Sequence, residues 1–105
     1  MNEPKEWTEE DIITLLDNRQ DAVERAILAI YKRQTAGEQI TGHTIEANGV
    51  GFSSYDDKTG TYLATYILSN RHLTGIYIER ARKLAKKYRR QLTEIANEYE
   101  VRKAA

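Results

Sequence analysis

Seven lysines and arginines lie within eleven residues in the second half of the sequence, with no acidic residue among them. At helical spacing they form two adjacent stripes, Arg80, Lys83, Lys87 and Arg90 in one and Arg82, Lys86 and Arg89 in the other. Such cations repel one another unless they are neutralised, and nucleic-acid phosphates would neutralise them with release of counterions. No recognition helix or RNA-binding aromatic motif accompanies them, so the pattern predicts backbone contact. The predicted nucleic-acid interface is Arg80, Lys83, Lys86, Lys87, Arg89 and Arg90, and Lys58, Arg71 and Tyr77 are candidates to extend it.

The chain itself offers a second way to neutralise this basic cluster, because its charges are segregated. The net charge of zero is the sum of −7 over residues 1–57 and +7 over residues 58–105. The acidic residues Glu9, Glu10 and Asp11 would then face the basic cluster, within one chain or between subunits. On charge alone, this internal pairing is favoured over a patch for an acidic partner such as DNA or RNA.

The residue types needed for other chemistries are missing or badly spaced. The chain has no cysteine, which excludes disulfides, thiolate zinc sites and thiol catalysis. Its two histidines, His43 and His72, have no metal-ligand spacing around them, and no serine stands in a nucleophile elbow. The glycine-rich segment 48–52 lacks the lysine and the spacing of a phosphate-binding loop. We therefore expect no enzymatic activity, no metal and no cofactor.

Four helices are predicted to position these residues, over residues 8–17, 19–35, 57–70 and 75–103. Thr8 and Thr74 fit N-caps, and Asp56 or Asp57 fits the N-cap of the third helix. Ala36-Gly37 fits the end of the second helix. The result is a mainly α-helical, four-helix compact domain.

A glycine-rich loop, residues 37–55, separates the second and third predicted helices. Asn48-Gly49 fits a type I′ hairpin turn, but the flanking arms are short and rich in glycine, so an ordered loop is the first expectation. Phe52 and Tyr55 are predicted to anchor this loop on the core. In the third helix, Gly60 weakens the helical pattern.

The last predicted helix carries an apolar heptad seam over three heptads. The seam is Ile78, Ala81, Ala85, Tyr88, Leu92, Ile95 and Tyr99. As one rod, residues 75–103 would be roughly 44 Å long, more than such a domain is wide. We therefore expect the seam to form a protein interface, most simply in a homodimer. The alternative is that the other helices of the same chain pack along it.

Seven tyrosines are a further feature of the composition. Tyr62 and Tyr66 are one helical turn apart, as are Tyr77 and Arg80. Tyrosine suits sites where a ring is buried and its hydroxyl reaches water or a partner. A place at the core edge or at a subunit interface is therefore favoured over base stacking, which usually needs an exposed sheet or groove.

The length of 105 residues fits one domain, predicted over residues 8–105 after a polar tail at residues 1–7. No apolar run approaches the ~20 residues of a membrane span, and none fits a signal peptide. We expect a cytosolic protein with no membrane partner.

Several short motifs together resemble one known family. They are Ala26–Thr35, Glu38-Gln39, Thr44, Asn48–Ser53, Asp56, Leu73-Thr74 and Lys87–Leu92. The family comprises small proteins and domains of bacteriophages and other mobile elements, some of them beside Swi/Snf-type helicase domains. The resemblance runs from Leu16 to Ile95, and the segment Lys58–Thr61 with its glycine departs from the pattern. It implies no catalytic or ligand residues, but it implies a nucleic-acid context by association.

The sequence thus leads to two functional hypotheses. In the first, the protein is a non-enzymatic phage or mobile-element accessory protein in the bacterial host cytoplasm, and its basic helix binds nucleic acid or a helicase-type, nucleic-acid-processing complex. In the second, it is a protein-binding module or an inhibitor of a host enzyme that acts through its acidic N-terminal half.

Overall fold

A computed structural model of the chain describes residues 6–41 and 51–104, and the side chains of residues 6–34 and 51–100 within them. The helices are α1 (Glu9–Asn18), α2 (Gln20–Thr41), α3 (Asp57–Leu68), α4 (Ile76–Lys87) and α5 (Arg89–Ala104). Among these residues there is no strand, so the mainly α-helical, compact prediction is confirmed. The Asn48-Gly49 hairpin turn lies outside the described residues.

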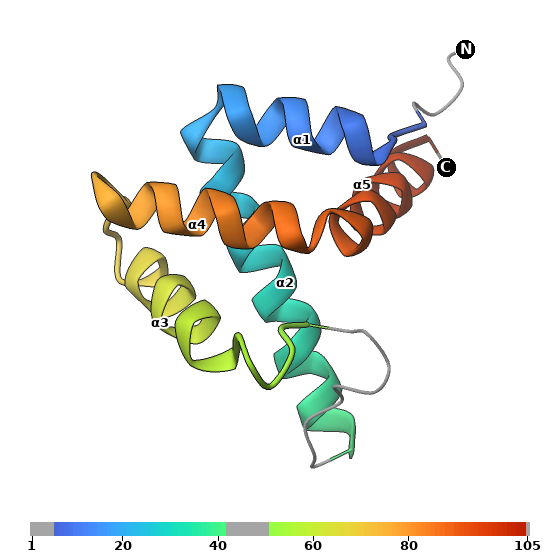
Figure 1. Cartoon of the computed structure of the whole chain (residues 1–105). Coiled ribbons are helices and arrows are strands. Elements are labelled where there is room, and N and C mark those ends of the chain that lie inside the picture. The colour runs from blue at the N-terminus through green and yellow to red at the C-terminus, as the bar shows by residue number, and fades with distance from the viewer. Residues whose placement is uncertain (1–5, 42–50, 105) are drawn as a thin grey trace.

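The helices form a packed arrangement around α2 and α4. In Figure 1, α4 crosses α2 and lies between α1 on one side and α3 on the other. Helix α5 turns away from the end of α4 and packs against α1 and α2. No helix in the described part of the chain has the length and apolar character that a membrane span requires.

Helix α1 begins where the sequence predicts, and residues 8–11 cap its first turn. The Thr8 hydroxyl accepts a hydrogen bond from the backbone N–H of Asp11 at 3.1 Å, and the Asp11 carboxylate accepts one from the N–H of Thr8 at 3.1 Å. This capping box satisfies two donors that would otherwise lack a partner. The helix buries Ile12 and Leu16 against the core.

Helix α2 is longer than predicted. The expected end at Ala36-Gly37 is wrong, because the helix continues to Thr41. One glycine costs a helix only about 1 kcal/mol relative to alanine, which does not end it by itself. The predicted apolar face is correct at Val23, Ala26, Ile27 and Ile30, all of which are buried.

The predicted helix over residues 75–103 is wrong as a single rod, because it is two helices that meet at Tyr88. This residue ends α4 with φ −103° and ψ 23°, outside the helical region, and α5 begins at Arg89. The bend lets both helices wrap around the chain's own core, which explains why the described residues form five helices instead of the predicted four. Their buried residues include Ile78, Ala81, Ala85 and Leu92, which belong to the predicted seam.

The start of α3 is built around Phe52. The ring is 1% exposed, as expected of an anchor, whereas Tyr55 is 88% exposed, so its predicted anchoring role is wrong. A Cβ atom at Gly60 would lie 2.4 Å from ring carbons of Phe52, so only glycine leaves room for the ring. Asp56 is the N-cap of α3, but its side chain makes no capping hydrogen bond. At α4 the N-cap is Gly75, with φ 57°, and not Thr74.

Candidate nucleic-acid interface

The basic cluster of residues 80–90 divides into cations that are bound within the chain and cations that are not. Lys86 pairs with Asp17, Lys87 with Asp56 at 2.7 Å, and Arg89 with Glu9 at 3.1 Å. Arg82 contacts Glu79 and donates to the backbone carbonyl of Leu16 at 2.9 Å. Three of these four carboxylates lie in the acidic first half, so the internal pairing that the charge split favoured is present. It uses Glu9 but not the neighbouring Asp11, which caps α1.

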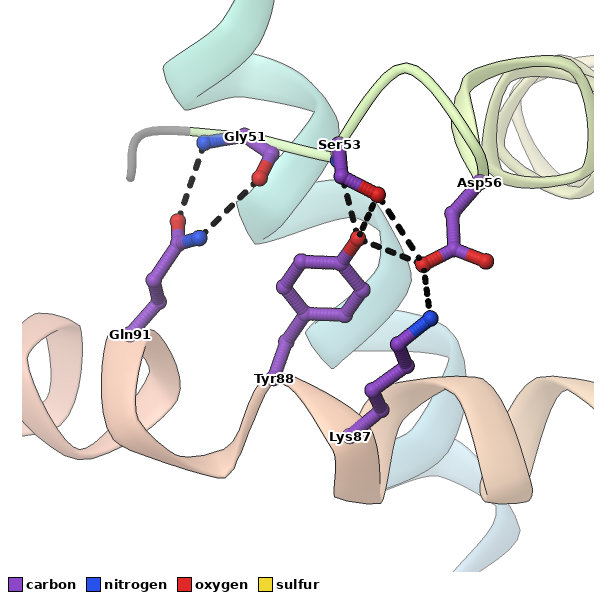
Figure 2. Close-up of polar contacts among 6 residues, drawn as sticks. All are labelled: Gly51, Ser53, Asp56, Lys87, Tyr88 and Gln91. Carbon is purple, nitrogen blue, oxygen red and sulfur yellow. Dashed lines mark hydrogen bonds and ion pairs between the residues drawn. The ribbon is translucent and has the colours of Figure 1, made fainter. Parts of the chain in front are cut away.

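Lys87 and Tyr88 belong to a polar network that holds residues 51–56 against the junction of α4 and α5 (Figure 2). The Tyr88 hydroxyl donates to the Asp56 carboxylate at 2.7 Å and accepts from the backbone N–H of Ser53 at 2.8 Å. Lys87 Nζ donates to the same Asp56 oxygen at 2.7 Å. The Ser53 hydroxyl lies 3.3 Å from this Asp56 oxygen as well.

Two glutamines extend this network along the same segment. The Gln91 side chain accepts from the backbone N–H of Gly51 at 2.9 Å and donates to its carbonyl at 3.0 Å (Figure 2). The Gln34 side chain accepts from the backbone N–H of Phe52 at 3.1 Å. Both glutamines are buried, and sequence reasoning did not single them out. The network unites residues of four motifs on which the family resemblance rests, and these motifs span residues 26–92 of the sequence.

The charges of this network favour the contacts that hold residues 51–56 in place, and we call the network a structural clamp for that reason. Burial alone would raise the pKa of Asp56, but the hydrogen bonds from Lys87 and Tyr88 and the Lys87 charge outweigh it, so this pKa lies below its ordinary value. Burial and the hydrogen bond to Asp56 raise the pKa of Tyr88. The phenol therefore stays a hydrogen-bond donor at neutral pH. The Asp56 oxygen near the Ser53 hydroxyl already accepts from Lys87 and Tyr88, and its lowered pKa makes it a weak base.

Three cations of the basic cluster, Arg80, Lys83 and Arg90, are exposed and have no ion pair among the described residues. Lys58 on α3 and Arg71 between α3 and α4 are exposed in the same way. Lys58, Arg71, Arg80 and Lys83 are therefore four exposed cations without an ion pair, among the described residues, on α3, on α4 or between them.

An aromatic cluster lies at this same place. The ring centroids of Tyr62, Tyr66 and Tyr77 are 6.3 to 6.5 Å apart in each of the three pairs. The Arg71 guanidinium lies 5.4 Å from the centroid of Tyr66. Tyr62 is 53% exposed and Tyr77 is 43% exposed, whereas the partly buried Tyr66 packs against the hydrophobic core.

Between these helices the surface forms a hollow of about 350 Å³, which we call the α3–α4 hollow. It is lined by Lys58, Thr59, Tyr62, Leu63, Tyr77 and Arg80. Aromatic rings and unpaired cations thus face one concave site, and none of its lining residues is acidic. The six-residue interface predicted from sequence is divided by the fold: Arg80 lines the hollow, whereas Lys86, Lys87 and Arg89 are paired elsewhere.

The predicted protein-interface residues have a different outcome. Ile78, Ala81, Ala85 and Leu92 are buried inside one chain, and Tyr88 is half-buried in the polar network. Leu92, Ile95 and Tyr99 help to line an apolar groove of about 440 Å³ formed by α1, α2 and α5, and Tyr99 is the most exposed of the three. The homodimer stays a prediction, and it now rests on this end of the seam instead of on all seven residues.

The structure describes one of the two histidines, His72. His72 Nδ1 lies 3.1 Å from a carboxylate oxygen of Glu24, whose other oxygen accepts from the N–H of Leu73 at 2.7 Å. His43 lies outside the described residues. Within the described ranges, no three His, Asp or Glu side chains form a group that could hold a metal ion.

No protein-family model matches the chain, and comparisons with curated proteins and with solved structures gave no match either.

Proposed function

We propose that this protein binds nucleic acid, independently of sequence, through phosphate contacts around the α3–α4 hollow. The observation that carries the proposal is that two exposed cations without a carboxylate partner, Lys58 and Arg80, line this hollow. Two more exposed cations are near these elements: Lys83 lies about one turn from Arg80 on α4, and Arg71 lies beside Tyr66. Arg80 and Lys83 are three residues apart on α4, so they lie on one helical face. Phosphates bound there would supply the neutralisation that the fold supplies to Lys86, Lys87 and Arg89.

The proposed contact set differs from the one that the sequence predicted. A phosphate that binds Lys87 must compete with Asp56, and one that binds Arg89 must compete with Glu9. Arg80 and Lys83 face no such competition. Lys58 and Arg71, which lie outside the 80–90 cluster, join the set because the fold brings their segments beside α4.

We propose the role of a non-enzymatic accessory protein for this chain. The resemblance to proteins of phages and mobile elements supports that role, a place in the bacterial host cytoplasm and a helicase-type partner. The alternative, a protein-binding module acting through the acidic half, has weaker support. Glu9, Asp17 and Asp56 are already paired with the chain's own cations.

Fluorescence anisotropy of labelled DNA and RNA, titrated with the protein at about 50 and 200 mM salt, tests this function. We expect binding that weakens steeply with salt. The double variant Arg80→Gln, Lys83→Gln should bind more weakly, with a salt slope reduced by about 0.7 to 0.9 for each lost phosphate contact.

The matched control removes two cations from another surface. Arg19 and Arg25 both pair with Asp21 at the start of α2, so Arg19→Gln, Arg25→Gln changes the net charge equally. This control should keep nearly all of the affinity. Absence of binding at about 50 mM salt, or an equal loss in both variants, contradicts a defined interface at α3 and α4.

A further inference from the structure

We propose that the α3–α4 hollow selects single-stranded over duplex nucleic acid, because bases stack on Tyr62 and Tyr77. This inference rests on the proposed function and names the form of nucleic acid that the same surface takes. It departs from the sequence-based expectation, which favoured the core edge or an interface for the tyrosines.

The first argument is the exposure of the rings. Centroid distances of 6.3 Å for Tyr62–Tyr66 and Tyr62–Tyr77, and of 6.5 Å for Tyr66–Tyr77, are too long for rings in full face-to-face contact. Tyr77 lies nearly parallel to Tyr66, at 16°, and Tyr62 is tilted against both rings, at 31° and 37°, so each ring contacts its neighbours in part. About half of Tyr62 and of Tyr77 still meets solvent. They also line the hollow. An aromatic face beside a concave site is the platform on which proteins stack unpaired bases.

The second argument is the order of charges and rings along the two helices. Lys58 precedes Tyr62 by one helical turn on α3, and Arg80 follows Tyr77 by about one turn on α4. Cations therefore line the same hollow as the rings, and Arg71 adds a third beside Tyr66. A nucleotide offers the complementary pair of groups, a flat base and an anionic phosphate. A purely apolar or an acidic peptide offers only one of the two.

Single strands and duplexes differ in whether the faces of their bases are accessible to a surface ring. In a duplex the base faces are covered by their neighbours in the stack, so a surface ring reaches only backbone or groove edges. In a single strand the faces are free to leave the stack and lie on a ring. The cations serve both forms, whereas the tyrosines serve only the single strand. Selectivity therefore depends on the rings, and the salt dependence depends on the cations.

The experiment compares a labelled poly-dT oligonucleotide, a poly-U oligonucleotide of equal length and a mixed-sequence DNA duplex at about 50 mM salt. We expect the single strands to bind at least about tenfold more tightly than the duplex. Tyr62→Leu, Tyr77→Leu should abolish that difference by weakening single-strand binding about tenfold or more, with the salt slope unchanged. Comparison of poly-dT with poly-U distinguishes DNA from RNA as the better ligand.

Two control variants separate stacking from a general loss of structure. Tyr62→Phe, Tyr77→Phe keeps both rings and should retain the preference for single strands. Tyr99→Leu removes an exposed tyrosine from the apolar groove of α1, α2 and α5 and should behave like the unaltered protein. Thermal unfolding followed by circular dichroism checks that each variant is folded.

The possible failures are distinguishable. Equal affinity for single strands and duplex, or an unchanged preference in the folded double leucine variant, overturns the stacking inference and leaves phosphate binding in place. Loss of the preference in the Tyr99 variant also overturns it. Absence of binding to all three nucleic acids overturns the proposed function as well, and the patch is then one for a protein.

Discussion

The polar network at residues 51–56 and the α3–α4 hollow are built from the same residue types but are in opposite states. In the network, the lysine and the tyrosine of Lys87-Tyr88 share one carboxylate, that of Asp56, and each is bound at 2.7 Å. In the hollow, Tyr77 and Arg80 have no carboxylate among the described residues. The difference is decided by whether the fold brings an acidic residue to the site. Lysines, arginines and tyrosines that are satisfied internally stabilise the fold, and those that are not remain available to an external anion.

The largest expected effect is on the packing that supports the network. Phe52→Ala should lower the free energy of unfolding by about 3–5 kcal/mol, because it removes a ring that is 1% exposed and leaves a cavity against Gly60. Urea unfolding followed by circular dichroism measures the change. Tyr55→Ala, three residues later and 88% exposed, is the matched control and should change stability by less than about 0.5 kcal/mol. Similar losses in both variants would mean that residues 51–56 do not pack as described.

The next effect concerns the carboxylate that distinguishes the two regions. Asp56→Asn should cost about 1–3 kcal/mol at neutral pH, because Lys87 and Tyr88 lose a buried charged acceptor. The pKa of Asp56 is lowered in the folded protein from the ordinary 3.8. Its contribution is therefore present above pH 3.8 and is lost as the pH falls through the lower folded value.

Denaturant unfolding at intervals from about pH 5 down to about pH 2 checks this sign. The unaltered protein should lose stability over that range by more than the Asp56→Asn variant does, because the other carboxylates are common to both. Parallel pH profiles would show that Asp56 has no favourable partners in the folded state. A variant that became more stable than the parent at neutral pH would contradict the clamp.

The sequence predicted those parts of the fold whose causes are local. The Thr8–Asp11 capping box spans three residues, and the apolar periodicity of residues 78–92 identified residues that are indeed buried. The break at Tyr88 was not predictable in this way, because the seam continues through it with unbroken heptad spacing. The Tyr88 hydroxyl contacts Ser53 and Asp56, which lie more than thirty positions earlier in the chain.

The sequence indicated which residue types form the candidate site, but not which individual residues belong to it. The density of cations at residues 80–90 indicated an anion-binding surface, yet only the fold shows that Lys86, Lys87 and Arg89 have partners. One missed signal was available: Gln34 falls on the apolar face of α2, after Ile27 and Ile30 at helical spacing. A polar side chain on a core face must find a hydrogen-bond partner, and this one binds the N–H of Phe52.

The smallest expected effect on stability, and the sharpest test of the comparison, is removal of two paired cations. Lys86→Gln, Arg89→Gln breaks ion pairs whose partners, Asp17 and Glu9, are about half exposed. Water and salt screen such pairs, so each should contribute no more than about 1 kcal/mol to stability. The affinity of the Lys86→Gln, Arg89→Gln variant for nucleic acid should stay within about twofold of that of the parent, since these two cations already have carboxylate partners.

This variant removes as much charge as Arg80→Gln, Lys83→Gln and from the same helical region, so total charge cannot account for a difference between the two. Anisotropy titrations of both at about 50 mM salt decide the matter. If the two lose equal affinity, phosphates displace the carboxylates of Asp17 and Glu9, and internal pairing does not determine which cations bind. If only the Arg80 and Lys83 variant loses affinity, the acidic half of the chain directs binding toward the α3–α4 hollow by pairing with Lys86, Lys87 and Arg89.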